Sequence, residues 1–123
     1  MPIEFVIEPE LGLVRTTLVG RITLPDMACY VRVLVTARLL GSPQLLDARA
    51  AVLQLTPDEV REFADLMESL RTVCGKAPVA FVTADAGSYR VAQHYWDLGA
   101  GSNPTYQVFE DLAAAETWLM ISR

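Results

Sequence analysis

The sequence predicts an α/β fold in which an N-terminal antiparallel β-hairpin is followed by strand–helix units, giving a five-stranded mixed sheet with four helices. Two observations predict this fold. The apolar residues alternate along the chain between the two-residue period of strands and the roughly 3.6-residue period of helices. After a first helix, three strand–helix units follow one another, and because such crossovers are right-handed, the sheet should be mostly parallel. We expect residues 1–123 to form one domain.

The hairpin is predicted from the alternation at the N-terminus. Ile3, Phe5 and Ile7 should point to one side of a strand and Glu4 and Glu8 to the other. A Pro-Glu-Leu-Gly turn at residues 9–12 then leads into a return strand at residues 13–19. One face of this hairpin should therefore be exposed to water.

The first helix should begin after Thr23 and run to about Leu40, where Gly-Ser-Pro at residues 41–43 ends it. Its core stripe is expected to be Met27, Tyr30, Val31, Leu34 and Ala37. Four further apolar residues lie off this stripe, namely Cys29, Val33, Val35 and Leu39. Such a helix is either covered on two sides or lies at an interface.

The remaining elements follow from strand and capping patterns. A strand at Leu45 and Leu46 ends in Asp47, and Thr56, Pro57 and Glu59 form a capping box for a helix. This reading gives a helix over residues 57–74, a strand over 77–83, a helix over 88–98, a strand over 106–109 and a final helix over 111–121.

Composition excludes several partners. The chain has 15 Asp and Glu residues against 10 Lys and Arg residues, a net charge of −5, so the attraction to phosphates that supports nucleic-acid or anionic-membrane binding is missing. The N-terminus lacks a basic and then continuously apolar segment, and Arg32 and Arg38 interrupt the longest apolar helix candidate. We expect no membrane insertion and a cytoplasmic location. The hydrophobic fraction of 52% is high for so short a chain, so some apolar surface should meet a partner.

The two cysteines, Cys29 and Cys74, fall inside predicted helices with no C-x-x-C spacing. We interpret them as reduced packing thiols rather than as metal ligands or redox groups. No metal and no cofactor is expected.

Three groups of segments carry a resemblance to a known family. They are Leu13-Val14 with Gly20-Arg21-Ile22-Thr23, Leu45-Leu46-Asp47 with Leu55-Thr56-Pro57, and Val108-Phe109-Glu110-Asp111 with Ala115 and Trp118-Leu119. Together they resemble the SpoIIAA-like (STAS/CRAL-TRIO-type) family of small bacterial proteins, over essentially the whole chain. These are packing, capping and strand-end patterns rather than catalytic signatures, so the resemblance bears on the fold more than on activity. It implies a mixed sheet that the hairpin begins.

The resemblance suggests two kinds of function. STAS-type relatives bind a kinase partner and are switched by phosphorylation of a serine in a D-x-S pattern after the third strand. Here the pattern reads Asp47-Ala48-Arg49, so the hydroxyl group is absent and a phosphoryl switch at this position is excluded. CRAL-TRIO relatives hold an apolar ligand against the sheet, and this shorter chain would accommodate only a small one.

The carboxyl ends of the parallel strands should deliver a polar cluster of Asp47, Arg49, Asp85 and Asp111. The favoured interpretation is structural: Asp47 and Asp111 cap helices, and Arg49 pairs with one of them. The alternative is a small-molecule site.

His94 is the only histidine and is expected on an exposed polar stripe of its helix, beside Arg90 and Asp97. No G-x-S-x-G motif accompanies any serine. An enzyme that uses His94 with Asp85 or Asp97 is therefore disfavoured.

Tyr89 and Trp96 are large aromatic residues outside the core stripe of their helix. Either they contribute to an interface together with Val33 and Val35, or Trp96 folds over the loop at residues 99–104.

Two hypotheses for function follow. The leading one is a non-enzymatic, cytoplasmic protein-interaction or regulatory module that self-associates as a homodimer or binds a regulatory protein partner. The alternative is a carrier or sensor of a small apolar molecule, held in a cleft that Met27, Tyr30, Val31, Tyr95 and Trp96 would line.

Overall fold

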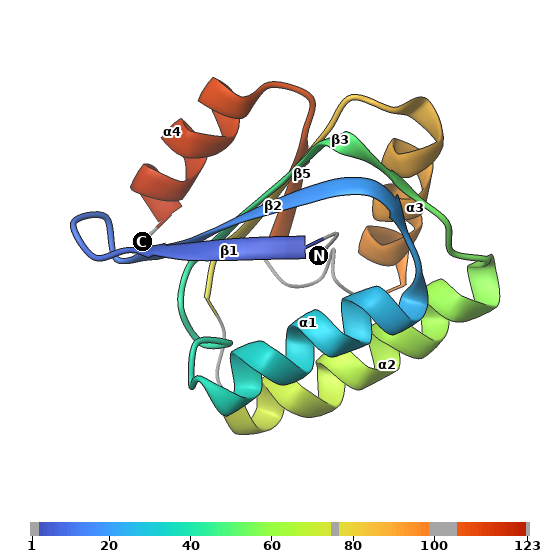
Figure 1. Ribbon diagram of the computed structural model, residues 1–123, viewed down its shortest axis with the longest axis horizontal. Helices are drawn as coiled ribbons and strands as arrows, with labels where there is room; N and C mark the ends of the chain where they lie inside the picture. The colour runs from blue at the N-terminus through green and yellow to red at the C-terminus, as the bar shows by residue number, and fades with distance from the viewer. Residues whose placement is uncertain (1–2, 75–76, 99–105, 123) are drawn as a thin grey trace.

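The protein is a five-stranded sheet with helices on both faces (Figure 1). The computed structural model describes residues 3–74, 77–98 and 106–122. The strands lie in the order β1-β2-β3-β4-β5; β1 is antiparallel to β2, and the other neighbours are parallel. The elements are β1 (Ile3–Glu8), β2 (Leu13–Ile22), α1 (Leu24–Thr36), β3 (Gln44–Leu53), α2 (Pro57–Cys74), β4 (Val79–Thr83), α3 (Ala86–Asp97), β5 (Tyr106–Phe109) and α4 (Leu112–Ser122). The predicted fold class is confirmed.

The helices divide unequally between the two faces. Helices α1, α2 and α3 cover one face, and α4 lies on the opposite face against β3, β4 and β5 (Figure 1). Side chains of β2 point alternately to the two faces of the sheet. Val14, Leu18 and Ile22 belong to the larger core under α1–α3. Leu13 points to the other face and packs with Ala115 and Leu119 of α4. Because α4 is alone on its side, part of that face is left without a helix.

Strand β3 is longer than the sequence predicts. We expected it to end at Asp47, but it continues to Leu53 and pairs with β2 as far as Ile22. The continuation is favoured because Ala48 and Ala51 are both buried in the large core; being three residues apart, they reach the same face only because the strand is irregular between them. The register shifts between Thr17 and Val19, which marks a bulge in the β2–β3 ladder.

The capping box of α2 lies where the sequence places it. The Thr56 backbone N–H donates to Glu59 Oε1 at 2.9 Å, and the Glu59 N–H donates to Thr56 Oγ1 at 3.2 Å. The helix then runs over Pro57–Cys74, as predicted.

Helix α1 ends four residues before the predicted Leu40. Arg38 adopts a left-handed conformation with φ of 60°. Its N–H donates to the Val35 carbonyl at 3.1 Å, and the Leu39 N–H donates to the Leu34 carbonyl at 2.8 Å. These two bonds form a Schellman motif, which usually has glycine at the left-handed position. No residue pattern signals this helix end, because the first glycine in this region is Gly41.

Among the described helices, none has the length and apolar character needed to cross a membrane.

Candidate functional site

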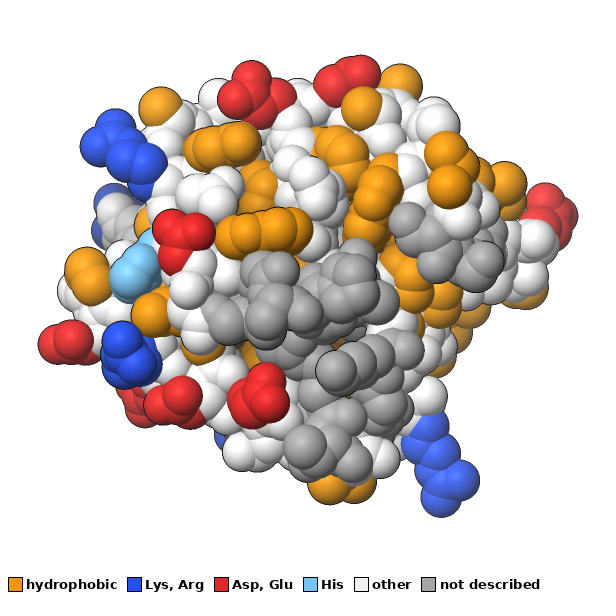
Figure 2. All heavy atoms as spheres, turned by 180° about the vertical axis from the view of Figure 1, so that it is seen from behind, with side chains coloured by type: hydrophobic (Ala, Val, Ile, Leu, Met, Phe, Trp, Pro, Cys, Tyr) orange, Lys and Arg blue, Asp and Glu red, His pale blue; other side chains and the backbone are white. Residues whose placement is uncertain are grey.

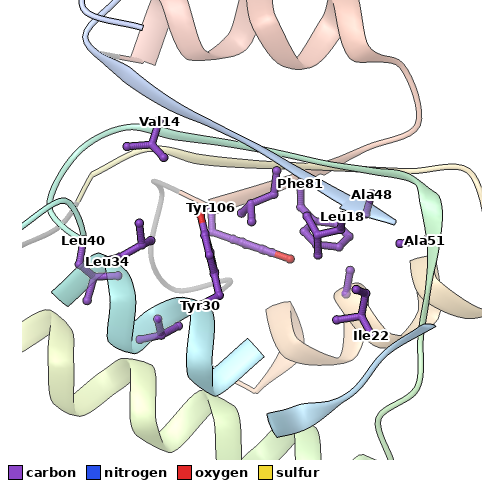
Figure 3. Close-up of a cluster of buried hydrophobic side chains, with 13 residues drawn as sticks. Val14, Leu18, Ile22, Tyr30, Leu34, Leu40, Ala48, Ala51, Phe81 and Tyr106 are labelled. Carbon is purple, nitrogen blue, oxygen red and sulfur yellow. The ribbon is translucent and has the colours of Figure 1, made fainter. Parts of the chain in front are cut away.

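The interior holds a pocket between the three-helix layer and the sheet, with a volume of about 120 Å³. Its walls come from four places in the fold, and Tyr30 and Tyr106 extend into the space between the helices and the sheet (Figure 3). Principal lining residues are Met27, Tyr30, Val31 and Leu34 of α1, Val60, Phe63 and Met67 of α2, Val91, Ala92 and Tyr95 of α3, and Gln44, Leu46, Phe81 and Tyr106 of the sheet.

The structure places four of the predicted cleft residues around this one pocket, namely Met27, Tyr30, Val31 and Tyr95. Trp96, which the sequence analysis added to them, does not line it. Its ring packs instead against Tyr106, with centroids 5.8 Å apart. The predicted fold of Trp96 over residues 99–104 lies outside the described residues.

A chain of hydrogen bonds forms the polar part of the pocket. The hydroxyl groups of Thr16 and Tyr30 lie 2.6 Å apart, and Tyr30 Oη donates to Gln44 Oε1 at 3.2 Å. The Gln44 amide nitrogen in turn donates to the Leu40 carbonyl at 3.5 Å. Burial raises the pKa of Tyr30 to about 12, with the Thr16 bond opposing the shift, so the phenol is neutral at physiological pH.

Aromatic rings form another wall. The Tyr95 ring meets Tyr106 edge-on at 5.2 Å and lies 5.7 Å from the ring of Phe63. Burial also raises the pKa of Tyr106 well above its usual range. Sequence reasoning missed Gln44, Phe63 and Tyr106 as site residues. One signal was present, since Gln44 is a polar residue at the start of a strand that is otherwise apolar.

The structure brings part of the predicted strand-end cluster together: Arg49 pairs with Asp47, and its charge also interacts with that of Asp111. Arg49 forms two 2.9 Å bonds to the Asp47 carboxylate, and these bonds hold the pKa of Asp47 below its usual value although partial burial opposes the shift. Asp47 was expected to cap a helix, and this was wrong because β3 continues through it. Asp111 does cap a helix, accepting from two backbone N–H groups of the first turn of α4 at 3.3 Å each.

Asp85 is the N-cap of α3, which therefore starts at Ala86 rather than at the predicted Ser88. Its carboxylate accepts from the Ser88 backbone N–H at 2.8 Å and from Ser88 Oγ at 3.0 Å. Ser88 Oγ is also the acceptor for the Leu53 N–H at 2.9 Å, so this group ties α3 to the end of β3. The Asp85 carboxylate thus serves the packing of α3.

His94 is half-buried on α3, and within the described residues it makes no hydrogen bond to Asp85 or Asp97. The Asp97 carboxylate instead accepts from the Gln93 amide at 3.4 Å. The part of the chain that the structure describes also holds no group of three or more His, Cys, Asp or Glu residues able to bind a metal.

Cys29 is a free, exposed thiol, so its interpretation as a packing residue was wrong. It falls on the outer side of α1, away from the buried Tyr30 and Val31. The Cys74 side chain lies outside the described residues.

The predicted interaction residues do not form one surface. Val33 and Val35 are exposed on α1, but residues two apart on a helix point about 200° away from each other. Tyr89 and Trp96 are half-buried on α3, where they border a shallow depression with Gln93 and two β5 residues. On the face seen from behind, hydrophobic side chains gather in several groups between charged ones (Figure 2).

Comparison with known proteins identifies the fold. No protein-family model and no curated protein matches the sequence. The structure is similar to the crystal structure of an uncharacterized protein of the DUF3478 family from Shewanella loihica PV-4, which has a SpoIIAA-like fold. The two chains are 19% identical, the match covers 95% of this chain and 93% of the other, and the TM-score is 0.59. The chain therefore has a SpoIIAA-like fold, as its sequence predicts.

Proposed function

We propose that this protein is a non-enzymatic binding module that carries or senses a small apolar ligand in its interior pocket. The observation that supports the proposal is the pocket of about 120 Å³, bounded mostly by aliphatic and aromatic side chains. Protein interiors are otherwise packed so closely that voids larger than a water molecule are few. For scale, an engineered apolar cavity of roughly 150 Å³ in another protein binds benzene.

The apolar atoms that line an unfilled pocket lack neighbours on one side and so lose dispersion contacts. A ligand that fills the space supplies these contacts. The volume limits the ligand to about the size of a single six-membered ring.

The polar residues elsewhere support binding rather than catalysis. Asp47 is paired with Arg49, and Asp85 and Asp111 cap helices. Each group already has a structural role, and none faces a histidine at the distance that acid–base catalysis requires.

The proposal is tested by titrating the protein with benzene and with indole, following backbone amide shifts by NMR and thermal unfolding. Benzene should shift the signals of α1, α3 and β5 and raise the unfolding temperature, whereas the larger indole should bind more weakly. The variant Ala92→Leu fills the pocket and should lose the response, while Ala113→Leu, on the exposed side of α4, should keep it. Equal responses of both variants, or none in the wild type, would overturn the proposal.

A second candidate function is self-association through a part of the sheet that α4 leaves open. We call this part the open sheet face; it comprises Thr17, Val19, Ala50 and Val52, all exposed. The register places Val19 beside Ala50, with Val52 two residues further along β3. The two valines are 53% and 46% exposed, so both leave apolar surface in contact with water on this face.

The charges around the open sheet face favour a second copy of the chain as its occupant. Glu4 lies beside Thr17, and Arg21 lies beside Val52, so opposite charges stand at the two ends. A two-fold axis at the level of Val19 would bring Glu4 of each copy toward Arg21 of the other.

Light scattering across a range of concentrations tests this candidate. Val19→Glu should leave the protein monomeric, whereas Val33→Glu, on the outer side of α1, should leave the dimer intact. A dimer that Val33→Glu disrupts and Val19→Glu does not would place the interface on α1 instead.

A further inference from the structure

The lining of the pocket restricts the chemistry of its ligand. Among the described lining residues none carries a charged side chain, and the polar ones are Tyr30, Gln44, Tyr95 and Tyr106. A charged ligand would lose its hydration without gaining a counter-ion, and the free energy needed for that is several times larger than for a neutral molecule. The pocket therefore selects a neutral ligand.

The side-chain amide of Gln44 has more hydrogen-bonding groups than partners. Its side chain is 4% exposed, and its amide has one acceptor oxygen and two N–H donors. The oxygen accepts from Tyr30 Oη at 3.2 Å. Among the described residues the amide nitrogen donates only to the Leu40 carbonyl, at the long distance of 3.5 Å. One N–H donor of this buried amide is thus left without a partner.

The surrounding bonds fix which way the amide points. If the oxygen and nitrogen atoms of Gln44 exchanged places, the oxygen would face the Leu40 carbonyl oxygen, and two acceptors would oppose each other. In the observed orientation the Tyr30 hydroxyl donates to Gln44, so the Thr16 hydroxyl must donate to Tyr30. The hydrogen atoms of both hydroxyl groups are therefore engaged in hydrogen bonds. The unmet group of this network is a donor, not an acceptor.

We propose that the pocket ligand is a small neutral carbonyl compound, such as a cyclic ketone, whose oxygen accepts a hydrogen bond from the free N–H of Gln44. This inference rests on the proposed function, since it names the class of ligand for the same pocket. A ketone matches the site because it brings one acceptor and no donor of its own. Its ring fills the apolar part of the pocket, and its oxygen satisfies a buried donor that is otherwise costly to leave unpaired.

The test compares cyclopentanone with methylenecyclopentane, which have the same number of non-hydrogen atoms and nearly the same shape. Dissociation constants come from NMR titration, with the side-chain amide signals of Gln44 as a direct reporter. We expect cyclopentanone to bind about 3- to 10-fold more tightly, the effect of one hydrogen bond, and to shift the Gln44 amide signals. Methylenecyclopentane should bind without shifting them comparably.

Two variants test whether the Gln44 amide is the source of the preference for cyclopentanone over methylenecyclopentane. Tyr30→Phe removes the hydroxyl but keeps the Gln44 donor, so the preference for cyclopentanone should persist. Tyr30→Phe combined with Gln44→Leu also removes the Gln44 donor. Because both variants lack the Tyr30 hydroxyl, Thr16 has lost the same partner in each, so the comparison isolates the Gln44 amide, and the double variant should lose the preference while both compounds still bind.

The outcomes separate the two proposals. Equal affinities in the wild type, or a preference that survives in the double variant, would overturn the carbonyl assignment and leave the apolar pocket standing. If neither compound binds while the protein remains folded, the proposed function fails and the assignment fails with it.

Discussion

Filling the pocket with one side chain is the most direct perturbation of this structure. Ala92 lies on α3, is 4% exposed and lines the pocket, so leucine at this position projects into the empty volume. The change adds three carbon atoms, which contribute about 0.8 kcal/mol each when they are buried. Ordering the leucine side chain costs about 0.5–1 kcal/mol, so Ala92→Leu should raise the free energy of unfolding by between about 1 and 2 kcal/mol.

The measurement is urea unfolding followed by circular dichroism, with thermal unfolding in parallel. For a chain of this length the gain corresponds to about 4–8 °C in the midpoint temperature. The control Ala113→Leu makes the same change on an exposed helical position and should alter stability by less than about 0.5 kcal/mol.

The opposite result would refute the reasoning. Adding methylene groups to a core that is already filled forces side chains out of their rotamers and costs about 1–3 kcal/mol. If Ala92→Leu lowers stability by that amount while Ala113→Leu is neutral, the space beside Ala92 is not available, and the volume of the pocket cannot be used by a ligand either.

Four other changes have defined expectations, each measured by urea unfolding. Thr83 Oγ1 is buried with no hydrogen-bond partner among the described residues, so Thr83→Val should stabilise the protein by about 1 kcal/mol; a loss of stability would mean that the hydroxyl has a partner. Ser88→Ala should cost about 1–3 kcal/mol, because the Leu53 N–H loses its acceptor, and a neutral result would contradict this bond. Arg38→Gly should stabilise the protein by about 1 kcal/mol, since glycine adopts the positive φ without the Cβ penalty; a loss of stability would contradict this account of the helix end. The pKa of Tyr30 is about 12 in the folded protein and about 10 in the unfolded chain, so the hydroxyl is protonated in both below pH 10 and its contribution to stability is then fully present. Between pH 10 and 12 the unfolded chain ionises first, and the advantage of the wild type over Tyr30→Phe in free energy of unfolding should shrink by up to about 3 kcal/mol. A difference that stays constant over this range would show that Tyr30 ionises normally.

The sequence was sufficient for the parts of the fold that local chemistry decides. The capping box of Thr56 and Glu59 sets the start of α2, and the alternation at residues 3–8 gives the edge strand β1. The same patterns placed Tyr30 and Tyr95 on the inner sides of their helices, where they line the pocket.

Other features depend on contacts between residues distant in the chain. Strand β3 continues past Asp47 because β2 pairs with it as far as Leu53, whereas β4 pairs with it only as far as Ala48. The residues of β3 alone do not show how far its neighbour extends. Arg38 ends α1 because the buried Leu34 and the packed Leu39 fix the motif around it, which overrides the preference for glycine. The role of Gln44 could not be predicted, since its partner Tyr30 comes from another element and the pocket exists only in the assembled fold.

The strand order has a consequence for how the chain assembles. Every strand pairs with the strand that precedes it in the sequence, so a chain emerging from the ribosome can add each new strand to an edge that is already formed. Pairings between sequence neighbours keep loop-closure costs low and avoid waiting for the C-terminus. Strand β5 joins last, and it carries Tyr106, a wall of the pocket. In this order of assembly the pocket gains its last wall only when β5 joins the sheet, after the strands and helices that support it are in place.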